Sequence, residues 1–337
     1  MTKTSAIQTP ARIDRRNAMI AGLATVGACM LQAPVLSMDK SWIPIVDCHQ
    51  HLWDLSRQKL SWLQGNDTLG RSFVMKDYLA AIEGTGITKA VYMEVDVDKD
   101  EKILEGEIVT DLCKQAGSPT VAAVLGCIPD APDFANYVNH WKKNPFVRGF
   151  RTVLSGDNDQ CVMPNFVRGI QTIGEAGFRF DLCTSPKGLA NCVKLVKSCP
   201  DTRFIVDHCG NVEIKAWRLQ NRNDEASRKM ILEWKRDMTM LAGKQDTICK
   251  ISGIVAQVPK GWTAEDIAPA INFCLDTFGP ERVVVGSDWP VCLTGATLVE
   301  WIKALLEIIA SRPDSDQRKL LHENAVRHYA IEKLAVN

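Results

Sequence analysis

The sequence has no excess of either charge and no run of basic residues in the body of the chain. Its 337 residues include 40 lysines and arginines and 40 aspartates and glutamates, so the formal net charge is zero. A basic surface is the usual electrostatic mark of a nucleic-acid-binding protein, so we expect no nucleic-acid partner. With 46% apolar and 24% charged residues, the composition is typical of a globular protein with a large core.

The 12 cysteines contain no Cys-x-x-Cys pair, which argues against a zinc knuckle and a thioredoxin-type redox motif. Five of them lie in apolar segments that resemble strands, namely Cys48, Cys127, Cys183, Cys209 and Cys249. We therefore predict that these cysteines are small buried hydrophobes and do not form a disulfide framework.

Long apolar runs are also missing. The apolar stretch from Asn17 to Ala28 is shorter than the roughly 20 residues that a transmembrane helix needs. It follows Arg15-Arg16, which is the order of a twin-arginine export signal. We predict an export signal and tail in residues 1–38, a folded domain in residues 39–337, and export to the periplasm or cell envelope. The alternatives are a cytoplasmic protein with an unstructured or amphipathic tail, and a lipid anchor at Cys29, where the processing-box match is imperfect.

Short β-branched segments alternate with amphipathic helical patterns from residue 45 onward. The strand candidates are Ile45 to Leu52, Lys89 to Asp96, Val121 to Ile128, Val147 to Leu154, Gly177 to Cys183, Thr202 to His208, Thr247 to Gly253 and Arg282 to Trp289. Strands that alternate with helices predict a parallel sheet, because parallel neighbours need a crossover. Eight strands within about 250 residues predict a single-domain (β/α)8 TIM barrel. The alternative is an open nucleotide-binding sheet, but the first strand lacks the Gly-x-Gly-x-x-Gly turn that such a sheet carries.

Two histidines one residue apart end the first strand candidate. Residues two apart share one face of a strand, so Asp47, His49 and His51 are expected to line a single face. Three such groups are costly to bury without a polar task. A motif this short also fits one structural histidine beside an exposed one.

Polar residues lie near the carboxyl ends of six predicted strands. They are Asp47, His49 and His51 on the first, Arg151 on the fourth, Asp181 on the fifth, His208 on the sixth, Lys250 and Ser252 on the seventh, and Asp288 on the eighth. The active site of a (β/α)8 barrel forms at this end of the strands. We therefore expect these residues to face one cavity.

Each of these residues also fits a purely structural role. Arg151 and Asp181 could pair with one another, and Lys250 could extend to the rim. His208 could hydrogen-bond a neighbouring loop, and Asp288 could cap the helix that follows. The coincidence of six strands favours a shared site over these separate roles.

Five motifs occur in order along the chain: His49-x-His51, Asp207-His208-Cys209-Gly210-Asn211, Cys249-Lys250-Ile251-Ser252-Gly253, Gly286-Ser287-Asp288-Trp289-Pro290 and Asn324-Ala325. Together they resemble the amidohydrolase-related family of the amidohydrolase superfamily, and within it the branch of sugar lactonases and 2-pyrone-4,6-dicarboxylate lactonases. The resemblance covers about residues 43–332. It implies a (β/α)8 hydrolase of the metal-dependent-hydrolase type, with functional positions at His49, His51, His208 and Asp288.

The resemblance implies one metal ion or none. Two-metal members of the superfamily carry a carboxylated lysine or a glutamate on the fourth strand, where this chain has Arg151, and two further histidines, of which it has only one. The expected ligands of a single zinc or manganese ion are His49, His51, His208 and Asp288, with Glu94 as a further candidate. A metal-free mechanism stays open, because the lactonase branch is thought to include members that work without metal.

The resemblance implies hydrolysis of the lactone of a small sugar acid or dicarboxylate-type substrate by an activated water. Asp288 would take the proton from the water, and the three histidines, alone or through a metal, would stabilise the oxyanion. The residues expected to contact the substrate are Arg151, Lys250, Asp181, Ser252 and Trp53, with Trp62 and Trp289 as further apolar walls.

Two other functions stay open at this point: a metal-dependent decarboxylase of an aromatic or unsaturated acid in the same superfamily, and a non-catalytic exported binding protein. The expected partner is a small molecule. We expect no transmembrane span in the folded domain, and the sequence leaves the oligomeric state open.

Overall fold

The computed structural model describes residues 43–154, 156–217 and 224–331. The predicted export signal in residues 1–38, with Cys29, lies outside the described residues. Within these described ranges, no helix combines the length and the apolar character needed to cross a membrane.

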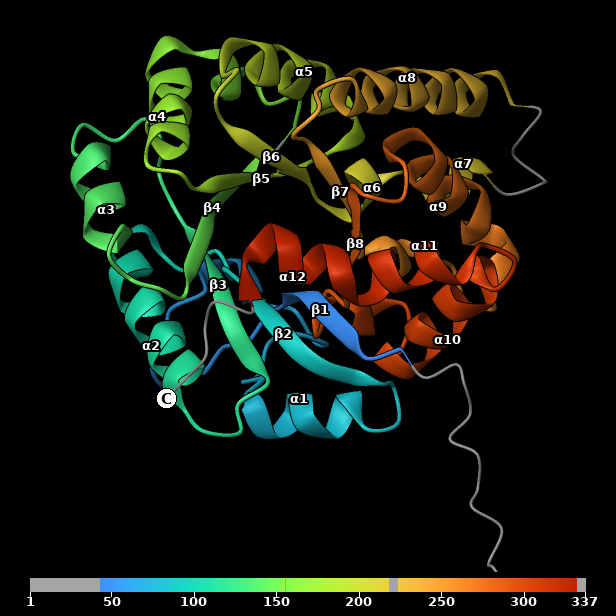
Figure 1. The fold of residues 1–337 in the computed structure, drawn as a ribbon, viewed down its shortest axis with the longest axis horizontal. Coiled ribbons are helices and arrows are strands. Elements are labelled where there is room, and N and C mark those ends of the chain that lie inside the picture. The colour runs from blue at the N-terminus through green and yellow to red at the C-terminus, as the bar shows by residue number, and fades with distance from the viewer. Residues whose placement is uncertain (1–42, 155, 218–223, 332–337) are drawn as a thin grey trace, which may run out of the picture. The chain divides into compact units, whose positions relative to one another are not determined.

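Eight parallel strands form one sheet in which each strand pairs with its sequence neighbour (Figure 1). They are β1 (Ile45–Gln50), β2 (Ile87–Met93), β3 (Thr120–Gly126), β4 (Val147–Leu154), β5 (Arg179–Thr184), β6 (Arg203–Val206), β7 (Ile248–Ile251) and β8 (Val283–Val285). The segment after β8 closes the sheet onto β1, because Asp288 N donates to His49 O and His51 N donates to Trp289 O, each at 2.8 Å. The predicted (β/α)8 barrel is confirmed.

Helices follow the strands around the outside of the barrel (Figure 1). They are α1 (Met75–Ile82), α2 (Lys102–Lys114), α3 (Phe134–Trp141), α4 (Pro164–Glu175), α5 (Leu189–Ser198), α6 (His208–Asn211), α7 (Ile214–Trp217), α8 (Glu225–Ala242), α9 (Ala264–Phe278), α10 (Leu298–Ile309), α11 (Asp314–Arg318) and α12 (Asn324–Tyr329). Thr297 caps α10 in a reciprocal capping box with Glu300. The alternative role of Asp288 as the cap of this helix is therefore wrong.

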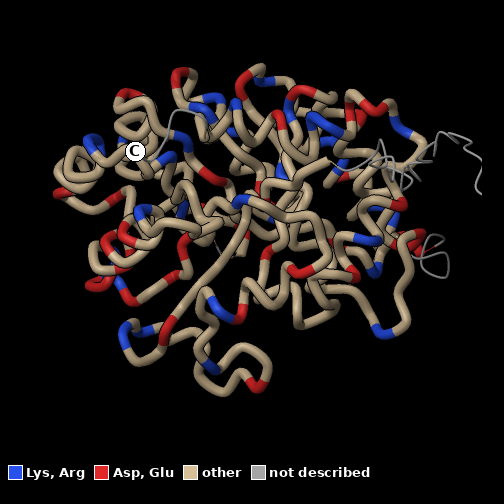
Figure 2. The backbone as a smooth tube through the Cα atoms, turned by 60° about the horizontal axis from the view of Figure 1, so that its bottom comes forward, with Lys and Arg blue, Asp and Glu red and all other residues tan. Residues whose placement is uncertain are grey.

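Apolar side chains fill the structure in two clusters. The smaller cluster lies inside the barrel and includes Val46, Val91, Val124, Ile205 and Val284, closed by Ala325, Tyr329 and Ile331 from the end of the chain. The larger cluster lies between the strands and the surrounding helices. Figure 2 shows Lys and Arg interspersed with Asp and Glu along the chain, as the balanced composition predicts.

Six of the eight strands end two to four residues earlier than the sequence pattern predicts, and for β6 and β8 the structure shows a clear reason. β6 ends at Val206 and β8 at Val285, whereas the predicted strands ran to His208 and Trp289. The reason is a left-handed backbone, with φ of +54° at His208 and +57° at Asp288, which extended strands exclude. These turns lie at the carboxyl ends of the barrel strands, where they redirect both side chains.

Candidate active site

A cavity of about 350 Å³ opens at the carboxyl ends of the strands. Its lining includes six of the residues predicted for the site: His51, His208, Asp288, Arg151, Trp53 and Trp62. The other predicted site residues lie behind its wall and are fully buried, namely His49, Lys250, Asp181, Ser252 and Glu94. The predicted set thus divides into a group that faces the cavity and a group that supports it.

Asp288 is the centre of the polar group. Its Oδ1 lies 3.2 Å from His51 Nε2, 3.6 Å from His49 Nε2 and 3.9 Å from His208 Nε2. These contacts join the turn after β8 to β1 and to the turn after β6. The predicted convergence of three histidines and one aspartate is present in the structure.

The hydrogen bonds of His51 fix which of its ring nitrogens carries a proton. Its Nδ1 lies 3.0 Å from the carbonyl oxygen of Met93, which can only accept, so Nδ1 donates. In the neutral ring, the lone pair of Nε2 then faces the carboxylate oxygen of Asp288. Two electron-rich atoms at this distance call for a shared proton or a cation between them.

The Nε2 atom of His49 lies near the same point, but its one lone pair accepts a hydrogen bond from Arg151. Arg151 Nη1 lies 3.2 Å from His49 Nε2 and can only donate, so Nε2 accepts and Nδ1 carries the proton, toward Asp207 at 3.6 Å. Burial lowers the pKa of His49 well below its usual value, and the charges of Lys250 and His208 lower it further. His49 is therefore a neutral imidazole, which is the form that binds metals.

His208 is held by the segment that follows β7. Its Nδ1 lies 3.0 Å from Ser252 Oγ, and burial lowers its pKa. Gly253 has φ +62°, and a Cβ atom there would overlap the His208 ring. Only glycine fits this position without displacing the histidine.

The donor set fits one divalent cation. Ligand atoms about 2.1 Å from a common tetrahedral centre lie about 3.4 Å apart. The observed 3.2 Å and 3.6 Å separations around Asp288 Oδ1 are close to that value. Of the three groups of described residues that could hold an ion, two contain His49: His49, His51 and Asp288 form the first, and His49, Asp207 and His208 form the second. Glu94 belongs to neither group.

Glu94 instead fixes Arg151. Arg151 Nε donates to Glu94 Oε1 and Nη2 donates to Glu94 O, each at 2.7 Å. The second carboxylate oxygen of Glu94 accepts from Asp96 N at 2.8 Å and lies 4.0 Å from Lys102 Nζ. Although burial raises the pKa of Glu94, Arg151 and Lys102 bring it below its usual value. Both oxygens of Glu94 are occupied, so the structure does not support it as a metal ligand.

A buried ion-pair cluster lies beneath the histidines. Lys250 Nζ lies 2.7 Å from Asp181 Oδ2 and 2.9 Å from Asp207 Oδ1, and all three side chains are 0% exposed. Burial alone would raise the pKa of Asp207, but Lys250 and His49 hold it well below its usual value. Lys250 and Asp181 therefore do not lie where a substrate could touch them, and they position Asp207 from below. The alternative pairing of Asp181 with Arg151 does not occur.

Two further expectations need correction. Asp47 does not share the site with the two histidines, because its carboxylate accepts from Tyr78 Oη at 2.8 Å and from Ser287 N at 2.7 Å. The pairing of β1 with β2 is irregular between Asp47 and Gln50, which shifts the alternation of side chains. Trp289 is not a cavity wall, since it packs inside against Phe73 and Tyr78.

The structure adds residues that the sequence did not single out. Asp207 contacts both His49 and Arg151 and is buried, and Asn211, Gln257 and Asp96 line the cavity. Asp207 and Asn211 flank His208 within one motif, which is a signal that could have identified them. Gln257 lies in a turn after β7 and has no such signal.

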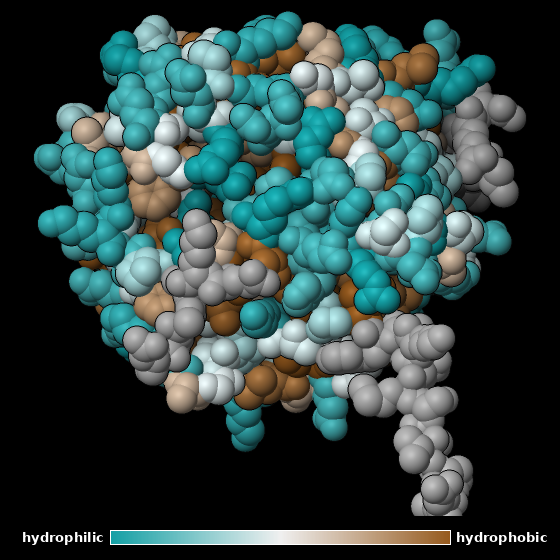
Figure 3. Space-filling view, viewed as in Figure 1, coloured by the Kyte–Doolittle hydropathy of each residue, from teal (hydrophilic) through white to brown (hydrophobic). Residues whose placement is uncertain are grey.

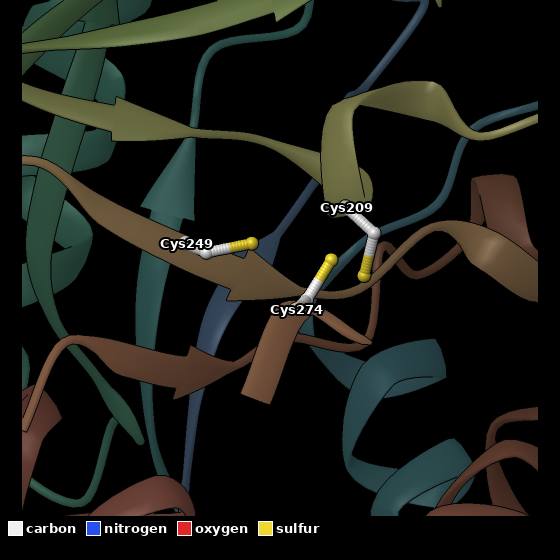
Figure 4. Close-up of side chains that lie close together, drawn as sticks. All are labelled: Cys209, Cys249 and Cys274. Carbon is white, nitrogen blue, oxygen red and sulfur yellow. The ribbon is translucent and has the colours of Figure 1, made fainter. Parts of the chain in front are cut away.

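Three cysteine thiols lie close together, as Figure 4 shows for Cys209, Cys249 and Cys274. They come from the turn after β6, from β7 and from α9, and each is fully buried. Structural zinc sites use four ligands, and no other described residue joins this group. All the cysteines in the described part of the chain are free thiols, and four of the five singled out are buried, as predicted, while Cys183 is only partly buried.

Comparison with known proteins gives matches along most of the chain. Residues 46–331 match the family model described as Amidohydrolase. The chain is 25% identical over 301 residues to an L-fucono-1,5-lactonase of Burkholderia multivorans, covering 86% of this chain and 97% of the relative. It is 24% identical over 339 residues to an L-rhamnono-gamma-lactonase of Scheffersomyces stipitis, covering 85% and 98%.

A solved structure shares the fold. The crystal structure of an amidohydrolase from Burkholderia multivorans with bound zinc matches with a TM-score of 0.72 and 23% identity, covering 85% of this chain and 99% of that chain.

Proposed function

Because this chain belongs to the amidohydrolase family, we propose that it is a hydrolase that opens the lactone ring of a small sugar acid. The observation that carries the proposal is the position of Asp288 Oδ1, which lies on the cavity wall where three imidazoles converge. The lactonase relatives support the reaction class.

The residues that face the cavity have separate tasks in this proposal. Asp288 takes a proton from the attacking water and transfers it to the leaving oxygen of the opened ring. Arg151, fixed by Glu94, presents positive charge toward the oxyanion that forms at the lactone carbonyl. His51 and His208 border the same space and orient Asp288.

His49, His51 and Asp288 would hold one divalent ion, zinc or manganese. A bound ion supplies Lewis-acid polarisation of the carbonyl. The fixed tautomer of His51 keeps the lone pair of its Nε2 directed at this point, and His49 would bind an ion through the Nε2 atom that accepts from Arg151 in the structure.

The cavity walls fit a sugar ring. Trp53 and Trp62 lie edge to face with ring centroids 6.0 Å apart, and both line the cavity. Such rings bury the C–H face of a sugar. Asn211 donates its Nδ2 to Thr184 O at 2.7 Å and so presents its carbonyl oxygen, and Gln257 adds a second amide. These groups are suited to the hydroxyls of the substrate.

A lactone panel followed with a pH indicator, with and without a chelator, tests the proposal. Asp288→Asn should lower turnover by about a hundredfold or more, the usual scale for a lost general base, while the unfolding midpoint stays near that of the wild type. Asp111→Asn is the matched control, because Asp111 is 71% exposed on α2. Near-normal turnover in Asp288→Asn would refute the assignment.

The same panel separates the two alternatives. Release of carbon dioxide from aromatic acids, without acid production from lactones, would identify a decarboxylase. Thermal stabilisation by lactones without turnover would identify a binding protein.

A further inference from the structure

We propose that Arg148, Arg179 and Arg203 form a binding site for an oxyanion of the phosphate or carboxylate class. The site lies at the amino-terminal end of the barrel, opposite the active site. Carbonyl oxygens of α12 accept hydrogen bonds from arginines at the beginnings of β4 and β5, so α12 lies at this end of the barrel. Figure 1 looks onto this end, with α12 in front. Most of the side chains gathered on this face in Figure 3 are hydrophilic.

The register of the sheet brings the three arginines together. Arg148 is the second residue of β4, and Arg179 and Arg203 are the first residues of β5 and β6. Arg179 pairs directly with Arg203, and Gly149, next to Arg148, pairs with Arg179. Three adjacent parallel strands therefore each begin with a guanidinium at the same level of the barrel.

The arginines border a cavity of about 430 Å³, and no described residue of its lining is acidic. Lys142 and Lys143 add two exposed ammonium groups at its edge. Arg327 also lines the cavity, but its charge is balanced by Glu281 at 2.8 Å. Burial lowers the pKa of His328 to about 4, so it is neutral at pH 7 and adds no charge. Among the residues that the structure describes, the cavity is thus surrounded by cations with no acidic counter-charge on its lining.

Arg179 carries the strongest argument for a missing anion. Its side chain is buried, with 8% of its surface exposed. Within the described ranges, no carboxylate oxygen lies within 4.0 Å of Arg148, Arg179 or Arg203. Burial and the neighbouring charge of Arg203 lower the pKa of Arg179 to about 10, yet it remains a cation at pH 7. A buried cation without a partner is costly, and an anion in the cavity would offset that cost.

Backbone contacts hold the guanidinium groups in place. Arg148 Nε donates to Tyr329 O at 2.6 Å and Arg179 Nε donates to His328 O at 2.7 Å, which ties down the end of α12. Arg203 Nη2 donates to Gly177 O at 2.5 Å. The Nη groups of Arg179 make no hydrogen bond to any described residue. Guanidinium groups fixed in this way lose little side-chain freedom when they bind an oxyanion through their remaining donors.

Calorimetric titration and thermal unfolding of the full chain test the site, with inorganic phosphate as the probe and sodium chloride at equal ionic strength as the reference. Phosphate should bind and raise the unfolding midpoint above the chloride value. Arg203→Gln and Arg148→Gln should each weaken phosphate binding by about tenfold, because each removes a charged hydrogen-bond donor. Acetate forms the second arm: a response to phosphate alone assigns a phosphate-type ligand, and a response to both assigns oxyanions generally.

Two comparisons separate an anion site from a purely structural role. Without phosphate, Arg203→Gln should unfold at the same or a higher temperature than the wild type, because it removes a charge that repels Arg179. If Arg203 had a purely structural role, its replacement would only lower the unfolding temperature. Lys229→Gln, which removes an exposed charge from α8, should bind phosphate like the wild type. The proposal is refuted if phosphate acts no differently from chloride, or if both arginine variants respond to phosphate as the wild type does.

Discussion

Replacing Lys250 by methionine separates a contact with substrate from a supporting role. Methionine keeps most of the length of the side chain and removes its charge. Two carboxylates, Asp181 and Asp207, would then remain fully buried without the cation that lies 2.7 Å and 2.9 Å from them. Removing one partner of a buried ion pair costs about 3 to 5 kcal/mol, so we expect a loss of that size in the free energy of unfolding.

The effect on the reaction should appear in kcat rather than in KM. Lys250 does not line the cavity, so the substrate keeps its contacts. Asp207 lies 3.6 Å from His49 and 3.5 Å from Arg151, and it would lose the charge that holds its pKa down. The pKa of Asp207 then rises, and the side chain loses its negative charge when it takes up a proton. The loss of this charge disturbs the groups that act on the carbonyl, and kcat falls.

Urea unfolding and steady-state kinetics on the best lactone measure the two effects. Because the carboxylate left behind accounts for much of the cost, the double variant Lys250→Met/Asp181→Asn should recover about 1 kcal/mol or more of the lost stability. The exposed control Lys229→Met should change it by less than about 0.5 kcal/mol. Unchanged stability in Lys250→Met would refute the supporting role, as would a tenfold rise in KM at constant kcat.

Three further predictions concern stability, metal binding and export. Burial and the charge of Glu94 raise the pKa of Glu105 from 4.5 to about 7. The protonated Glu105 therefore stabilises the folded chain below pH 4.5, and this contribution is lost as the pH rises through 7. In thermal melts, Glu105→Gln should be more stable than the wild type at about pH 8.5, and its unfolding midpoint should vary no more with pH than that of the wild type below about pH 8.5. A chelator should lower the unfolding midpoint, and zinc or manganese should restore it, since an ion at about 100 times its Kd adds about 2.7 kcal/mol; equal midpoints would contradict a bound ion. The double variant Arg15→Lys/Arg16→Lys should stay in the cytoplasm on cell fractionation, and unchanged export would contradict a twin-arginine signal.

The order of strands and helices was predictable because each strand has an apolar run and each helix an amphipathic period. The ends of β6 and β8 were not, because the positive φ values at His208 and Asp288 arise from tertiary contacts and follow no residue pattern. The same turns direct these two side chains into the cavity. The sequence thus indicated which residues meet at the site, while the backbone geometry that brings them together required the structure.

The depth of a charged residue within the barrel was also beyond the sequence. Arg151 and Lys250 both lie on strands and both looked suited to a substrate carboxylate, yet Arg151 lines the cavity and Lys250 is fully buried. Arg151 and Asp181 are paired in the register of β4 and β5, but their side chains choose other partners, Glu94 and Lys250. Which ions pair inside a barrel depends on the layer of inward-pointing side chains that each residue joins. The alternation of apolar and polar residues along a strand does not reveal that layer.

The division of charged residues into two layers bears on substrate selection. The lower layer, with Lys250, Asp181 and Asp207, sets the charge and protonation of the histidines and has no access to the substrate. Under the proposed function, discrimination among lactones must therefore come from the upper walls, which Trp53, Trp62, Asn211 and Gln257 line. These residues lie on loops beyond the strands, which can change without disturbing the ion pairs below. Substitutions at Asn211 or Gln257 should therefore alter KM among lactones with little effect on unfolding.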